Sequence, residues 1–372
     1  MRIEIWADVV CGWAYIGKRR LEKALASWEG EPVEVVWRPY QIDPAAPERA
    51  VPLAEALQDP MTDEALRACA PGLTPAENRV RVADLAAAEG LGPRWGAEWR
   101  ASTLQAHRLI ALAYEQGGAE LQDRVVEGVL KAHFIDFQDI SDPATLAAIA
   151  TTTGLTTETG LTTDTGLTTD TGVTTETGLT ADTVPATDTG PATDTGRAGL
   201  LACGNRTPAP DAADLVRELL LTGKAKGVKT SPTIVVGDRA LAGAQSPEAI
   251  RDFLLDASRH IPRRLPAEVV RLRHADSLLD QRDPLGALTL LRPLLDEHGE
   301  DRGVRMLAAR AYYASAQLNR ARTALEALVA EVPDDSYARH LLGRTLQRQG
   351  KHEEAASHLT LAAVMTPDYA TR

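Results

Sequence analysis

The chain has 372 residues, enough for two or three domains, and its 44% hydrophobic and 25% charged residues are ordinary for a folded globular protein. A formal net charge of -12 argues against general nucleic-acid binding, which requires clustered basic surface. No stretch reaches the roughly 18 consecutive apolar residues of a membrane span, and the first residues lack the pattern of a secretory signal. Three widely spaced cysteines do not form a disulfide framework, so we expect a cytoplasmic location.

The chain opens with the pattern of a β-α-β unit. Residues 2–10 are an apolar run with β-branched members, which predicts a strand that ends before Cys11. The stretch from Trp13 to Trp28 has helical spacing, and residues 33–37 predict a second buried strand. Cys11 therefore lies at the start of a helix, where oriented N–H groups and the helix dipole favour the thiolate. We expect this position to lower the pKa of Cys11 below that of a free cysteine.

The four residues from Cys11 to Ala14 read Cys-Gly-Trp-Ala. In a Cys-x-x-Cys motif the first thiolate attacks a substrate disulfide, and the second cysteine, one turn further on, resolves the mixed disulfide. Ala14 cannot do this. From the residues alone, Cys11 is therefore either a single nucleophile or a small buried hydrophobic residue.

The central part of the chain changes character twice. Residues 50–150 have helical spacing almost throughout, which predicts a helical subdomain inserted after the β-α-β unit. Over residues 151–197, acidic residues recur every sixth position and glycines recur in step. A hexapeptide β-helix would explain the period, but its five apolar rungs are too few to bury a continuous core. A flexible acidic Thr/Gly linker is the favoured interpretation.

Ordered structure is expected again from about residue 211. A helix over 211–227 is followed by a strand at 233–236, a short partner strand at 240–242 and a helix at 246–258. Together with the opening unit, these elements predict an α/β, thioredoxin-like fold with an inserted helical subdomain. The segment 262–266 closes this first module.

The last part of the chain repeats with a period of 34 residues. The residues that recur at this spacing are Ala287, Ala321 and Ala355; Leu291, Leu325 and Leu359; Ala275, Ala309 and Gly343; and Pro333 and Pro367. Small residues where two helices touch, with a terminating proline, resemble the tetratricopeptide (TPR) pattern. Three units, at 268–301, 302–335 and 336–369, predict an all-α TPR-like solenoid.

Several segments resemble the FrnE-like branch of the DsbA family in the same order. They are DVVCGWAYIGKRRLEKAL, WRPYQIDP (37–44), STLQAHRL (102–109), HFIDFQDISDPATLAAIA (133–150) and GVKTSPTIVVGDRALAGAQ (227–245). The usual form of this branch carries a CPWCYIGKRR-type run. This chain departs from it at Gly12, where proline is common, and at Ala14, where the resolving cysteine stands. The resemblance implies the thioredoxin fold and puts dithiol redox activity in doubt.

The resemblance also implies the residues of an active site. Cys11 would be the catalytic residue. Pro232 is expected to be cis and to face Cys11, so that the Ser231 backbone turns towards an incoming peptide or thiol. Trp13 is expected to shape the rim of the site. His107 matches an A-H-R motif and either lines the cleft or packs within its helix.

These observations give a domain plan. A DsbA/FrnE-like thioredoxin domain occupies 1–150 and 205–262, with 50–150 as its helical insertion, and the low-complexity linker occupies 151–204. The TPR-like repeats occupy 263–372. No metal-ligand spacing or phosphate-binding loop is present, so the sequence implies no metal and no cofactor other than a low-molecular-weight thiol as co-substrate.

Three functions fit this plan. The first is a monothiol thiol-disulfide oxidoreductase in which Cys11 forms mixed disulfides with protein or small-thiol partners. The second is a redox-inactive adaptor whose TPR module binds a peptide or protein. The third is a thiol-conjugate isomerase or transferase. Retention of Cys11 favours the first and third, whereas Ala14 and the added TPR module favour the second. Nothing in the spacing of Cys69 or Cys203 identifies either as a resolving cysteine.

Overall fold

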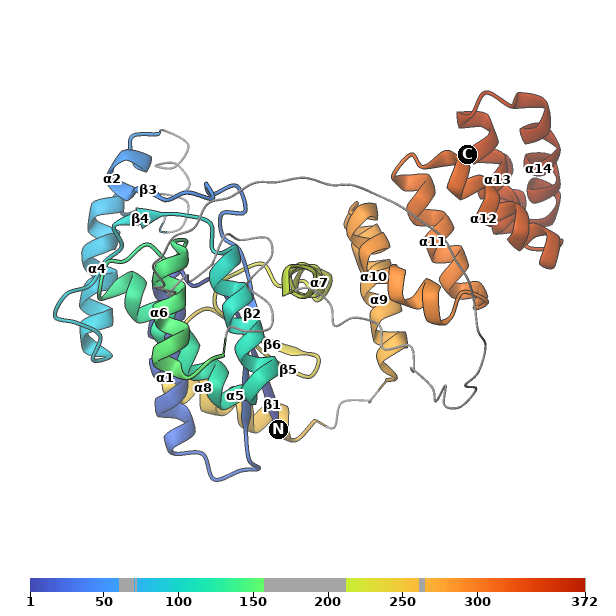
Figure 1. Ribbon diagram of the computed structural model, residues 1–372. Coiled ribbons are helices and arrows are strands. Elements are labelled where there is room, and N and C mark those ends of the chain that lie inside the picture. The colour runs from blue at the N-terminus through green and yellow to red at the C-terminus, as the bar shows by residue number, and fades with distance from the viewer. Residues whose placement is uncertain (60–69, 71, 157–211, 261–264, 372) are drawn as a thin grey trace, which may run out of the picture.

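The computed structural model describes residues 1–59, 70, 72–156, 212–260 and 265–371 (Figure 1). Cys69, Cys203 and most of the acidic repeat lie outside the described residues, and so do the predictions made for them. In the part of the chain that is described, no helix has the length and apolar character needed to cross a membrane.

A four-stranded sheet in the order β2-β1-β5-β6 forms the centre of the first module. Strand β1 (Arg2–Ala7) pairs in parallel with β2 (Glu34–Pro39) and antiparallel with β5 (Thr233–Val236). Strand β5 pairs in turn with β6 (Arg239–Ala242). This topology confirms the predicted α/β, thioredoxin-like fold and pairs β1 with a strand more than 220 positions later in the sequence.

Strand β1 ends earlier than its apolar run suggests. The run continues to residue 10, but the backbone N–H of Cys11 donates to the carbonyl of Asp8 at 3.0 Å, which turns the chain out of the strand. Val9 is nevertheless buried in the core. Apolar character there reflects burial in a turn and not a longer strand.

Helices cover both faces of the sheet. Helices α1 (Gly12–Ala26) and α8 (Pro247–Ser258) pack together on the face of Ile5 and Ile234. On the opposite face, α7 (Ala212–Ala225) approaches so closely that a Cβ on Gly223 would lie 2.6 Å from the ring of Trp6.

The predicted helical insertion is present, with two short strands that the sequence pattern did not indicate. Its elements are β3 (Val51–Pro52), α2 (Leu53–Ala56), α4 (Pro75–Ala88), β4 (Trp99–Arg100), α5 (Leu104–Phe134) and α6 (Pro143–Thr153). Among the described strands, β3 and β4 pair with each other and with no other strand. Helix α5 is interrupted at Gly117 and Gly118, whose backbones are not helical.

Residues 151–153, which begin the acidic repeat in the sequence, form the last turn of α6. The carboxylate of Asp142 accepts hydrogen bonds at the start of this helix, and Gly154 ends it with a φ of 79°. The side chain of Leu155 is buried in the core of the first module.

Six helices follow the predicted 34-residue period as three consecutive pairs. They are α9 (Ala267–Asp280), α10 (Pro284–Glu297), α11 (Arg302–Ala314), α12 (Leu318–Glu331), α13 (Ser336–Arg348) and α14 (His352–Met365), followed by the short helix η1 (Pro367–Thr371). Ala287, Ala321 and Ala355 are fully buried. A Cβ on Gly343 would lie 2.6 Å from Leu359 Cγ, so this position requires a small residue.

Helix α7 connects the two modules. It contacts α5 and β2 on one side and α9 and α10 on the other, and Figure 1 shows it between the sheet and these two helices. Leu221 packs into the core of the first helix pair, and Lys224 forms an ion pair with Asp283 at 2.6 Å. The hydroxyl of Ser277 donates to the carbonyl of Ala225 at 2.9 Å. The repeats are therefore attached to the sheet through one amphipathic helix.

Candidate active site around Cys11

Cys11 occupies the N-cap position of α1 and faces the loop before β5. Its backbone is extended, with φ -87° and ψ 110°, and its side chain makes no cap hydrogen bond. The thiol instead donates to the carbonyl oxygen of Ser231 at 3.3 Å. The peptide bond between Ser231 and Pro232 is cis. The fold thus brings together three of the residues that the sequence singles out.

The position of a resolving cysteine is filled by a buried methyl group. Ala14 is buried, and its N–H donates to the carbonyl of Cys11 at 2.8 Å. Its side chain borders a cavity of about 10 Å³ that is also lined by Gly17 and Pro232. Cys11 is the only cysteine in the part of the chain that the structure describes.

The helical insertion covers the start of α1. A Cβ on Gly12 would lie 3.3 Å from Trp95 and 3.8 Å from Phe134, and these two rings stack with their centroids 4.8 Å apart. Trp13 is only partly buried, and the guanidinium of Arg81 lies 5.5 Å from the centre of its ring. Trp13 therefore borders the outside of the site, while the stacked rings of Trp95 and Phe134 cover Gly12, the residue that follows Cys11.

His107 lies in the interior beneath the site. Its side chain is buried, with Nε2 2.9 Å from the carbonyl oxygen of Tyr40 and 3.4 Å from Asp8 Oδ1. Of the two roles that the sequence left open, burial of the ring favours packing within the core. A contribution of His107 to substrate binding stays a prediction.

Asp8 is a neighbour of Cys11 that the sequence reasoning missed. Only 1% of its side chain is exposed. Its Oδ2 accepts the N–H of Ile42 at 2.7 Å, and its backbone N–H donates to Ser231 Oγ at 2.9 Å. Its Oδ1 has no hydrogen bond. The sequence did contain a signal for this residue: Asp8 is an acidic residue inside an otherwise apolar run, three positions before Cys11.

A second buried histidine lies near Asp8. Burial lowers the pKa of His133 to about 4, although the carboxylates of Asp8 and Asp139 oppose this shift. The ring is therefore neutral at pH 7, and its Nδ1 has no hydrogen-bond partner. His133 supplies no positive charge to the site.

The prediction of a lowered pKa for Cys11 is wrong. Only 7% of the side chain is exposed, and burial raises its pKa above the usual cysteine value. Hydrogen bonds from the Ser231 side chain and from the Ala14 and Trp13 backbone act in the opposite direction, and the Asp8 carboxylate adds to the increase. Removal of the thiol from water outweighs the helix start.

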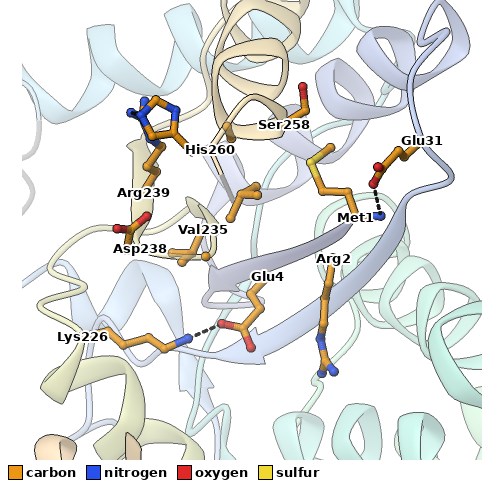
Figure 2. Close-up of a pocket in the computed structure, with 13 residues that line it drawn as sticks. Met1, Arg2, Glu4, Glu31, Lys226, Val235, Asp238, Arg239, Ser258 and His260 are labelled. Carbon is orange, nitrogen blue, oxygen red and sulfur yellow. Dashed lines mark hydrogen bonds and ion pairs between the residues drawn. The ribbon is translucent and has the colours of Figure 1, made fainter. Parts of the chain in front are cut away.

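A large polar hollow lies elsewhere on the same module (Figure 2). Its volume is about 890 Å³, and its lining includes Arg2 and Glu4 near the amino end of β1, whereas Cys11 follows the carboxyl end. Lys226 bridges to Glu4 there at 2.5 Å. Among the described residues, no group of three or more potential ligands could hold a metal ion.

Comparisons with known proteins support the assignment of both the thioredoxin-like module and the TPR-like module. Residues 2–166 match the family model of the DSBA-like thioredoxin domain, and residues 278–345 match that of a tetratricopeptide repeat. A search of curated proteins finds no match. One similar solved structure is a probable DsbA oxidoreductase from Streptomyces coelicolor, with 23% identity, a TM-score of 0.45, and coverage of 72% of this chain and 94% of its own. Another is a 2-hydroxychromene-2-carboxylate isomerase, with 12% identity, a TM-score of 0.41, and coverage of 70% and 94%.

Proposed function

We propose that this chain, which combines a DsbA-like thioredoxin domain with a tetratricopeptide repeat, exchanges thiols and disulfides through Cys11 alone. The observation that carries the proposal is the contact between the Cys11 thiol and the Ser231 carbonyl, next to a cis proline and at the start of α1. Ala14 supplies no second sulfur, so the product at this site is a mixed disulfide with a protein or small thiol.

The exchange needs two reagents, the partner disulfide and an external thiol. The Cys11 thiolate attacks one sulfur of the partner disulfide, the partner S–S bond breaks, and the second partner sulfur leaves and takes up a proton. An external thiol then attacks the mixed disulfide, becomes joined to the partner, and returns Cys11 to its reduced form. Each step exchanges one S–S bond for another.

The raised pKa of Cys11 favours a long-lived mixed disulfide. A thiol with a high pKa is a poor leaving group, so release of Cys11 from the mixed disulfide is slow. Strong thiol oxidants of this fold have the opposite property, because their reduced form is stabilised. We therefore infer that the protein retains partners at Cys11 and turns over slowly.

The test uses glutathione disulfide as the probe. Incubation of the full chain should add one glutathione to Cys11, and the adduct should persist after the probe is removed and disappear with dithiothreitol. Peptide mass spectrometry identifies the modified residue, with Cys11→Ser as the negative control and Cys69→Ser as the matched control. Modification of Cys69 or Cys203 in place of Cys11 would contradict the proposal.

A second candidate function is supported by the protonated state of Cys11. A thiol that keeps its proton at pH 7 and already donates a hydrogen bond could donate one to the sulfur of a bound small thiol. Cys11 would then orient a thiol conjugate for isomerisation or transfer and would not become covalently modified. Reversible binding of reduced glutathione without an adduct, lost in Cys11→Ala, would favour this function over the first.

The TPR helices support an additional binding function. Arg344 and Arg348 lie one turn apart on α13, and neither forms an ion pair within the described residues. Arg348 lies 4.7 Å from the ring centre of Tyr313 and donates to its carbonyl at 2.8 Å. Arg310, one repeat earlier than Arg344, is paired with Asp276 at 2.7 Å. Uncompensated arginines beside a tyrosine favour an acidic peptide as the partner.

A further inference from the structure

Arg81 lies beside the first turn of α1, although it belongs to the helical insertion. Helix α4 packs against this turn: a Cβ on Gly12, the residue after Cys11, would lie 3.5 Å from Val82 Cγ1. The residue before Val82 is Arg81, whose guanidinium lies 5.5 Å from the ring centre of Trp13. Two contacts therefore hold a positive charge next to the residues that lie one and two positions after Cys11.

The charge of Arg81 is free to meet a ligand. Its side chain is exposed and forms no ion pair with another described residue. On the turn before it, Glu77 accepts hydrogen bonds from Thr74 in a capping box, and Asp84 on the next turn is not within ion-pair distance. Because the ring of Trp13 already restricts the guanidinium, Arg81 loses little freedom when it binds a carboxylate.

Two further exposed cations border the same site. Arg94 stands next to Trp95, whose ring covers Gly12, and Lys229 lies two positions before Ser231. Neither forms an ion pair in the part of the chain that the structure describes. The chain as a whole is acidic, with a formal net charge of -12. A group of cations at one site of an acidic protein raises the concentration of anions there.

We propose that Arg81 is a specificity-determining residue that selects disulfides with a carboxylate close to the sulfur. The inference rests on the proposed function, since it names the class of partner that reacts with Cys11. In the exchange, Cys11 gives up its proton and joins one half of the disulfide, and the other half leaves and takes up a proton. The carboxylate of the bound half pairs with the guanidinium over Trp13 through charge-assisted hydrogen bonds.

The test compares three small disulfides that have carbon chains of similar length and different charges. Dithiodipropionate is anionic, hydroxyethyl disulfide is neutral and cystamine is cationic. Peptide mass spectrometry follows the mixed disulfide at Cys11 in the full chain, and each rate is divided by that of a short peptide with one cysteine and no other charged side chain. At low salt the normalised rate of the anionic probe should exceed that of the cationic probe at least about fivefold, and added sodium chloride should reduce this ratio.

Arg81→Gln should lower the ratio of the anionic to the cationic rate about two- to fivefold, the effect of one exposed ion pair. Arg79→Gln is the matched control. It removes the same charge from an exposed position of α4, but residues two positions apart on a helix point in nearly opposite directions, so the ratio should not change. Arg81→Lys keeps the charge and should keep most of the preference.

The outcomes separate this inference from the proposed function. Equal normalised rates for the three probes, or equal losses in Arg79→Gln and Arg81→Gln, would overturn the role of Arg81 and leave exchange at Cys11 in place. If none of the probes forms a mixed disulfide at Cys11, the proposed function fails and this inference fails with it. The salt dependence needs no variant, so a ratio that does not fall with added salt would also overturn the inference.

Discussion

The thiol of Cys11 donates a hydrogen bond to the carbonyl oxygen of Ser231 across 220 positions of sequence. This contact buries the sulfur between α1 and the cis-proline loop. It also stabilises the protonated thiol as a donor at the position where a substrate sulfur would approach. The chemistry of the site therefore depends on a residue that becomes a neighbour only when the sheet is complete.

The first prediction follows from this burial. Cys11 should react with iodoacetamide more slowly at pH 7 than cysteine in a short unstructured peptide, because burial raises its pKa. Its rate should still be rising at a pH where the peptide has reached its plateau. Mass spectrometry of the Cys11 peptide measures both rates, and a Cys11 that reacts faster than the free peptide would contradict the structure.

The second prediction concerns the missing sulfur. Ala14→Cys should raise insulin disulfide reduction severalfold, because the added sulfur lies one helical turn from Cys11 and can release the substrate intramolecularly. Ala14→Ser is the matched control, with a similar volume and no thiol, and should remain as slow as the natural protein. Equal turnover in all three proteins, with the fold retained, would argue against exchange at Cys11.

The third prediction is a loss of stability in acid. The folded pKa of His133, about 4, is below the unfolded value of about 6.5, so the unfolded state binds more protons between these values. The free energy of unfolding contributed by this residue is present above pH 6.5 and is lost as pH falls towards 4, by about 3 kcal/mol in total.

Denaturant titrations of the natural protein and His133→Gln measure this slope. The variant should lose less stability over the same pH range, whatever its stability at pH 7. His298→Gln, at the exposed C-cap residue of α10, should lose stability with falling pH as steeply as the natural protein. If the free energy of unfolding of His133→Gln falls with pH as steeply as that of the natural protein, another group causes the loss of stability in acid.

The fold could be predicted from the sequence because its periodic signals are local. Short apolar runs with β-branched residues indicate the strands around Ile5 and Ile234, and the 34-residue period places Ala321 and Ala355 at helix contacts. The length of β1 could not be predicted in this way. The chain turns between Asp8 and Cys11, and the valines of this turn continue the apolar run of the strand. The sequence pattern therefore does not distinguish the turn from a longer strand.

The site was less accessible to sequence reasoning. The helix start at Cys11 and the cis peptide at Pro232 were recognised from short motifs. The pKa of Cys11 could not be predicted from a motif, because the thiol is buried against Ser231, which lies 220 positions away in the sequence. The effect of a helix start can be estimated locally, whereas desolvation requires the complete fold.

The fourth prediction tests the packing of the repeats. Ala321→Leu should destabilise the C-terminal helices by about 1–3 kcal/mol, because the added carbons have no space at a fully buried contact. Ala314→Leu, at an exposed position on α11, is the matched control and should be nearly neutral. Thermal unfolding of the full chain measures both variants, and neutrality at position 321 would contradict the close packing between these helices.

The last prediction concerns the partner of the TPR helices. A fluorescent peptide of alternating glutamate and glycine should bind the full chain, and its affinity should fall steeply with added salt, because Arg344 and Arg348 are exposed. Arg344→Ala with Arg348→Ala should weaken binding at least tenfold, since each arginine contributes charge-assisted hydrogen bonds. Replacing Arg302 and Arg305 with alanine removes the same charge from arginines already paired with Asp335 and Glu331, and should change affinity little. Equal losses in the two double variants would mean that net charge alone attracts the peptide, and α13 would then not be a specific binding surface.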